Sequence, residues 1–128
     1  SGKIPENMIL LGEINDQNLL AEYYSMADIT VLTSRRETYS MVCAESLCCG
    51  TPVMGFCAGA PEMISIPEYS KFVTYGDMDG LERCIKNFIT SKKSFSSMEI
   101  EARAKERYSK EIMIRQYEGL YRRMACSE

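Results

Sequence analysis

The stretch that decides the fold is residues 29–56, which read ITVLTSRRETYSMVCAESLCCGTPVMGF. Residues 29–32 and residues 52–56 are continuous apolar runs, long enough for a buried strand and too short for a helix. Between them, residues 40–49 are apolar around nearly the whole helical wheel, and Gly50 is placed to end that helix. Continuous apolar strands that alternate with helices predict a parallel sheet that is covered on both faces.

The same alternation continues on both sides of this stretch. Residues 8–11 and residues 71–74 are two further apolar runs of strand length. Asp16 is a plausible N-cap for one helix and Ser109 for another. Helical periodicity marks residues 16–27, 78–90, 97–108 and 110–124. We therefore predict an α/β fold with an open, doubly wound parallel sheet of about four strands, followed by C-terminal helices.

The composition excludes several classes of protein. The chain has 128 residues, 45% of them apolar and 26% charged, which fits one globular domain. It has no apolar run of about eighteen residues and no signal segment at its start, so we expect a soluble protein. A net charge of −3 gives no basic field for nucleic acid, and the lack of histidine excludes Ser-His and Cys-His nucleophile pairs.

Four of the six cysteines, Cys43, Cys48, Cys49 and Cys57, lie within apolar runs. Their spacing lacks the paired C-x2-C pattern of a zinc site, and no histidine is available to complete one. We expect buried, reduced thiols, no metal site and a reducing compartment, which indicates the cytoplasm.

Glu45 is the unusual residue of the apolar helix, because a carboxylate there needs a ligand or a paired charge. Glu37 lies eight residues earlier, in the loop before the helix. If the helix begins near Ser40, its first N–H groups form an anion site beside Glu37. Glu45 then lies ~7 Å further along the helix. A phosphate flanked by two hydroxyl-binding carboxylates fits a nucleotide diphosphate sugar.

The residues alone leave a second interpretation open. Glu45 could form a structural ion pair with Arg35, Arg36 or Lys71, with Glu37 simply solvated. The chain would then be a non-catalytic α/β regulatory or interaction module. Nucleotide binding distinguishes the two interpretations.

Residues 28–62 resemble the signature region of the retaining GT-B glycosyltransferases known as glycosyl transferases group 1. Glu37 and Glu45 match the E-x7-E motif of that family. Residues 45–53, ESLCCGTPV, match its E-A-x-A-x-G-x-P-V run, and residues 59–62, GAPE, match its G-G-x-x-E turn. Fainter similarity covers nearly the whole chain, which resembles the C-terminal, nucleotide-sugar-binding, Rossmann-like domain of the family.

The resemblance implies a role for each matching position. Glu37, the candidate catalytic residue, would hold hydroxyls of the donor sugar, and Glu45 would accept hydrogen bonds from the ribose hydroxyls. The other binding groups would be the N–H groups of Tyr39 and Ser40 for the sugar, those of Met41 and Val42 for the diphosphate, and the loop of Gly12, Glu13 and Ile14 for the base. Thr38, Ser40 and Ala60 replace glycines of the family pattern, and their side chains narrow the approach to the sugar.

The implied activity is transfer of a sugar from a nucleotide diphosphate sugar to a hydroxyl acceptor, with retention and without a metal or other cofactor. Polysaccharide or glycolipid synthesis is the usual setting. Residues 1–128 would lack the first strand-helix unit of the donor domain and the whole N-terminal acceptor domain, so we expect the isolated chain to be inactive. The expected location is the cytoplasm, with peripheral attachment to the membrane as an option for the full-length protein.

Overall fold

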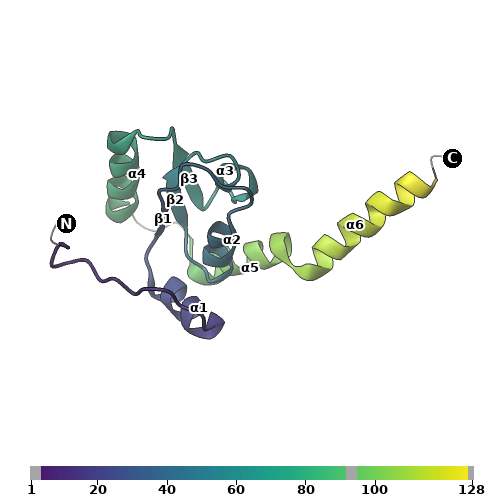
Figure 1. The fold of residues 1–128 in the computed structure, drawn as a ribbon, viewed down its shortest axis with the longest axis horizontal. Coiled ribbons are helices and arrows are strands. Elements are labelled where there is room, and N and C mark those ends of the chain that lie inside the picture. Colours follow the sequence, from purple (N-terminus) through teal and green to yellow (C-terminus); the bar gives the residue numbers. More distant parts are fainter. Residues whose placement is uncertain (1–3, 92–94, 127–128) are drawn as a thin grey trace.

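A computed structural model describes residues 4–91 and 95–126, and its core is a sheet of three parallel strands (Figure 1). The strands are β1 (Thr30–Leu32), β2 (Val53–Phe56) and β3 (Ser70–Val73), in the spatial order β1-β2-β3. Thr30 pairs with Val53, and Val53 pairs with Ser70. Every residue of the central strand β2 is buried, as expected for a parallel sheet with both faces covered.

Helices cover the two faces of this sheet (Figure 1). The helices of the described residues are α1 (Gln17–Met26), α2 (Met41–Cys48), α3 (Pro61–Ile64), α4 (Met78–Thr90), α5 (Ser97–Tyr108) and α6 (Lys110–Ala125). On one face α2 packs between the sheet and α5, and on the other face α4 packs against β2 and β3. This arrangement confirms the predicted doubly wound, Rossmann-like α/β class.

Alternate residues of β2 supply two separate cores, because successive side chains of a strand point to opposite faces. Val53 packs with Leu47 of α2 and Ile100 of α5. Met54 and Phe56 pack with Leu81 of α4 instead. The helical periodicity predicted for residues 78–90 is thus confirmed, because Leu81, Cys84, Ile85 and Phe88 all pack in this second core. Ile89, near the end of the helix, is 70% exposed.

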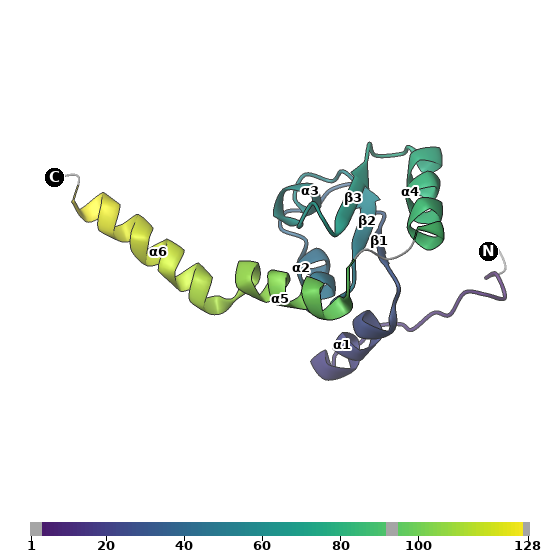
Figure 2. The ribbon, with the colours of Figure 1, turned by 180° about the vertical axis from the view of Figure 1, so that it is seen from behind.

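The predicted helix starts are also confirmed. The Asp16 carboxylate accepts hydrogen bonds from the N–H groups of Asn18 and Leu19, at 2.8 and 3.2 Å. The Ser109 hydroxyl accepts one from the N–H of Ile112 at 3.3 Å, so α6 begins where the sequence placed it. α6 then extends away from the sheet (Figure 2), and none of its residues is buried. No helix in the described part of the chain is both long and apolar enough to span a membrane.

The prediction of a strand at residues 8–11 is wrong, so the sheet has three strands rather than about four. This segment has no regular structure, and Ile9 is 82% exposed. An apolar run becomes a strand only when a neighbouring strand can take its backbone hydrogen bonds, and within residues 4–91 and 95–126 none does so. The short helix α3 was not predicted, because four residues are too few to show helical periodicity.

Gly50 allows α2 and α5 to approach closely. It follows the last turn of α2 with a φ of +79°, a left-handed conformation, as the sequence predicted. A Cβ atom at this position would lie 2.6 Å from the carbonyl oxygen of Ser97, the first residue of α5. Both the backbone conformation and the available space therefore require glycine here.

We predict that Gly50→Ala lowers the free energy of unfolding by about 2–5 kcal/mol. A left-handed alanine costs about 1–2 kcal/mol, and overpacking against Ser97 costs about 1–3 kcal/mol more. Gly76→Ala is the matched control, because Gly76 has a φ of +86° but nothing within 4 Å of the added Cβ. Urea unfolding measures both variants. Equal losses would show that close packing at Gly50 is not important.

Candidate functional site

Two loops meet at the carboxyl ends of β1 and β2. Residues 33–40 follow β1 and carry Glu37, and residues 57–60 follow β2. The N–H of Glu37 donates a hydrogen bond to the carbonyl oxygen of Ala58 at 3.0 Å. In open α/β sheets ligands bind at this edge, so the half-buried Glu37 lies where the sequence placed the site.

The second loop is fixed by Glu62. Its carboxylate accepts hydrogen bonds from the N–H groups of Ala58 and Gly59, at 3.0 and 2.8 Å. Burial acts to raise the pKa of this carboxyl, but the backbone hydrogen bonds that it accepts outweigh burial and lower the pKa below its usual value. Glu62 is therefore charged at neutral pH and stabilises the turn beside Glu37. Ala60 has a φ of −101°, so the glycine that it replaces was not needed for the backbone conformation.

Ser40 is different, because its backbone does adopt a conformation that favours glycine. Its φ is 62°, and it is the only non-glycine residue with a positive φ in the described part of the chain. The Ser40 hydroxyl makes no capping hydrogen bond to α2 and is buried without a hydrogen-bond partner among the described residues. The first-turn amides of Met41 and Val42 are therefore not satisfied by this side chain, and both residues are exposed. Such a helix start can bind an anion.

Glu45 lies one turn further along α2, half-buried and facing α1. Its Oε2 atom accepts a hydrogen bond from the Tyr24 hydroxyl of α1 at 3.3 Å. Arg35, Arg36 and Lys71 are all described residues, and none of them forms an ion pair with Glu45. Arg35 instead lies over the ring of Tyr75, 6.0 Å from its centre. The structure therefore does not support the structural ion pair of the second interpretation.

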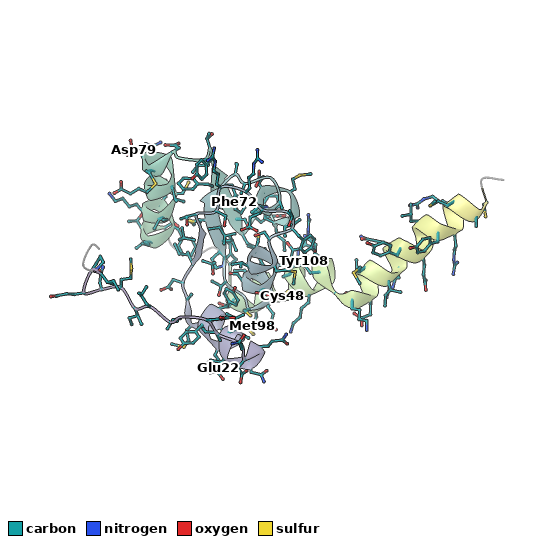
Figure 3. All side chains as sticks on the ribbon, in the orientation of Figure 1. Glu22, Cys48, Phe72, Asp79, Met98 and Tyr108 are labelled. Carbon is teal, nitrogen blue, oxygen red and sulfur yellow. The ribbon has the colours of Figure 1, made fainter. Side chains whose placement is uncertain are left out.

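A groove of about 260 Å³ separates α1 from α2 beside Glu45. It is lined by Gln17, Leu20, Ala21, Tyr24, Glu45, Cys48 and Cys49. Figure 3 shows Cys48 at the end of α2 that is close to α1. Partial burial, together with the charge of Glu45 and the hydrogen bond to it, raises the pKa of Tyr24 to about 12. The phenol is thus protonated at neutral pH and donates to Glu45.

The other predicted binding residues are Gly12, Glu13, Ile14 and Tyr39. Gly12 and Glu13 are exposed and Ile14 is half-buried, in the segment that leads to the Asp16 cap of α1. Tyr39 is half exposed and lines a cavity of about 480 Å³ with Arg107 and Tyr108 of α5, which sequence reasoning did not connect to the site. Glu37 thus lies in the loop before α2, Ser40 at the start of this helix and Glu45 one turn further along it. The assigned roles of all these residues stay predictions.

All six cysteines are free thiols, as expected, but not all of them are buried. Cys43 is buried, and its burial raises the pKa of the thiol to about 11. Cys48 and Cys49 are half-buried, and Cys57 and Cys126 are exposed. The prediction of burial is thus confirmed for Cys43, met only in part by Cys48 and Cys49, and wrong for Cys57. Cys57 follows the end of β2 and lies in the loop rather than in the sheet. Among residues 4–91 and 95–126, no three Cys, Asp or Glu side chains come together as metal ligands would.

We predict that Ser40→Gly raises the free energy of unfolding by about 1 kcal/mol. Relief of the left-handed conformation contributes about 1–2 kcal/mol, and the greater freedom of the unfolded chain offsets about 0.4–1 kcal/mol of it. Ser40→Ala is the matched control, because it removes the hydroxyl but keeps the Cβ atom. Urea unfolding of the wild type and of both variants measures these differences. A Ser40→Gly variant less stable than Ser40→Ala would contradict the backbone strain that we assign to Ser40.

The sequence of the chain is similar to those of known proteins. The family model described as Glycosyl transferases group 1 matches residues 2–106. N-acetyl-alpha-D-glucosaminyl L-malate synthase of Bacillus anthracis is 27% identical over 121 residues, which are 92% of this chain and 31% of that protein. D-inositol 3-phosphate glycosyltransferases of Thermomonospora curvata and Streptosporangium roseum are 51% and 44% identical, each over 43 residues that make up 34% of this chain and 10% of the relative. The chain thus covers less than a third of the length of each relative. Because the family model matches most of its length, the chain belongs to the glycosyl transferases group 1 family.

Proposed function

We propose that this chain is the donor-binding part of a glycosyltransferase, which moves a sugar from a nucleotide diphosphate sugar to a hydroxyl acceptor with retention. The observation that carries the proposal is the environment of Glu45. This carboxylate lies one turn beyond an uncapped helix start, and its partner is a phenol rather than a cation. Membership of the family supports the proposal, as do the names of two relatives, which are glycosyltransferases.

In this proposal the start of α2 binds the diphosphate. The N–H groups of Met41 and Val42 donate to its oxygens, and the positive end of the helix dipole stabilises its charge. That charge grows when the bond between the anomeric carbon and the diphosphate oxygen breaks, so fixed amides at this position promote the reaction electrostatically. The acceptor hydroxyl oxygen bonds to the anomeric carbon, and its proton passes to the oxygen of the departing diphosphate. No metal takes part in this proposal.

The carboxylates of Glu45 and Glu37 bind the two sugar rings of the donor. Glu45 accepts hydrogen bonds from the ribose hydroxyls, and Glu37 accepts them from the hydroxyls of the transferred sugar. The amides of Tyr39 and Ser40 reach the same sugar. The loop of Gly12, Glu13 and Ile14 lies beside the base.

The acceptor side of the proposal concerns the whole protein, because this chain covers only 31% of the Bacillus anthracis relative. We place the acceptor in an N-terminal domain of the kind that the family resemblance implies. Such an enzyme would act in the synthesis of a polysaccharide or a glycolipid, in the cytoplasm.

We predict that Glu45→Gln weakens binding of a nucleoside diphosphate by on the order of 1.5–3 kcal/mol, the range for hydrogen bonds to charged groups. The melting temperature should hardly change, because no cation loses its partner. Calorimetric titration of the full-length natural protein with UDP, GDP and ADP measures binding, and thermal melts measure stability.

Glu22→Gln is the matched control for this test, because Glu22 is an exposed carboxylate of α1. It should bind the same nucleotides as tightly as the wild type. A wild-type protein that binds none of the three would contradict the proposed function. So would a Glu45→Gln variant that melts at a much lower temperature but binds with unchanged affinity per folded molecule.

A further inference from the structure

Hydrogen bonds of three hydroxyl groups link the end of α1, α2 and β1, namely those of Thr51 and Ser46, which are buried, and of Thr30, which is half-buried. The Thr51 hydroxyl donates a hydrogen bond to the carbonyl oxygen of Tyr24 at 2.6 Å, and Thr51 is only 2% exposed. The Thr51 N–H donates to the carbonyl oxygen of Ser46 at 3.0 Å. The Ser46 hydroxyl lies 2.8 Å from that of Thr30 on β1. Tyr24 therefore has a backbone position that is fixed relative to both the sheet and α2.

From this fixed position the Tyr24 side chain reaches Glu45. Its hydroxyl lies 3.3 Å from Oε2, across the groove between α1 and α2. Gln17, Leu20 and Ala21 line the groove on the α1 side, and Cys48 and Cys49 line it on the α2 side. Of the groove residues, Tyr24 is the one whose side chain hydrogen-bonds to the Glu45 carboxylate. The raised pKa of Tyr24 agrees with this geometry, because it keeps the phenol in the form that donates.

A carboxylate has two oxygens and can accept about four hydrogen bonds. The phenol uses one position on Oε2, which leaves Oε1 for a ligand. A free glutamate side chain loses rotational freedom when it binds, and that loss weakens the complex. A residue that holds the side chain before the ligand arrives reduces this cost.

We propose that Tyr24 is a positioning residue for Glu45, and that it orients the carboxylate toward the two ribose hydroxyls of the donor nucleotide. This inference rests on the proposed function, because it assigns a ribose to Glu45. Tyr24 does not touch the reacting atoms. It acts through Glu45, and its effect should depend on the hydroxyls of the ligand.

The test is Tyr24→Phe in the full-length natural protein. The ligands are whichever of UDP, GDP and ADP the wild type binds most tightly, and the 2′-deoxy counterpart of that nucleotide. Loss of one hydrogen bond, at about 1 kcal/mol, corresponds to about a fivefold loss of affinity for the ribonucleotide. The affinity for the 2′-deoxy nucleotide should change by less than about twofold, because the ribose contact that the phenol supports is already weakened.

Tyr23→Phe is the matched control, because Tyr23 is a half-buried tyrosine of the same helix. Its hydroxyl, unlike that of Tyr24, forms no hydrogen bond to another described residue. It should leave both affinities unchanged, and thermal melts should show that both variants are folded. Equal losses for the two nucleotides would show a merely structural role and overturn the inference, as would an unchanged affinity for the ribonucleotide. A wild-type protein that binds none of the three nucleotides would overturn the proposed function, and this inference with it.

Discussion

The parallel pairing of β1 with β2 is the constraint on which the rest of the site depends. Leu32 lies opposite Gly55, so the two strands end at the same edge and their loops leave it together. A Cβ atom on Gly55 would lie 2.3 Å from the Leu32 carbonyl oxygen, so the strands cannot approach in this way with any larger residue. The hydrogen bond from Glu37 to Ala58 then joins the loops, and α2 has to begin beside them. The left-handed backbone of Ser40 is the point at which the chain turns into that helix.

The position of α2 explains how one helix can be both a core element and a binding element. Cys43 and Leu47, four residues apart, are fully buried on the face that packs against the sheet and α5. Met41 and Val42 stay exposed at the start of the helix, and Glu45 points toward α1. The sequence predicted a helix that is buried all round. The structure instead leaves Met41 and Val42 of its first turn exposed.

Much of the fold could be predicted from local patterns. The Asp16 cap, the buried strands and the stripe of α4 each depend on residues that are close in sequence. The segment 8–11 could not be assigned in this way, because its apolar residues have the pattern of a strand whatever lies beside them. Contacts between residues that are distant in sequence were equally hidden at the site. The spacing of Glu37 and Glu45 was visible in the sequence. The partner of Glu45, in contrast, is a tyrosine 21 positions earlier, in a segment for which the sequence indicated only helical periodicity.

The decisive experiment is a crystal structure of the full-length natural protein with a bound nucleoside diphosphate. We expect ribose hydroxyl oxygens at about 2.6–3.2 Å from the Glu45 carboxylate, and diphosphate oxygens at similar distances from the N–H groups of Met41 and Val42. Another cavity, of about 310 Å³, lies between β3 and α4, lined by Met54, Lys71 and Phe88 among others. A nucleotide bound in that cavity, without contact to α2, would show that α2 does not bind the donor.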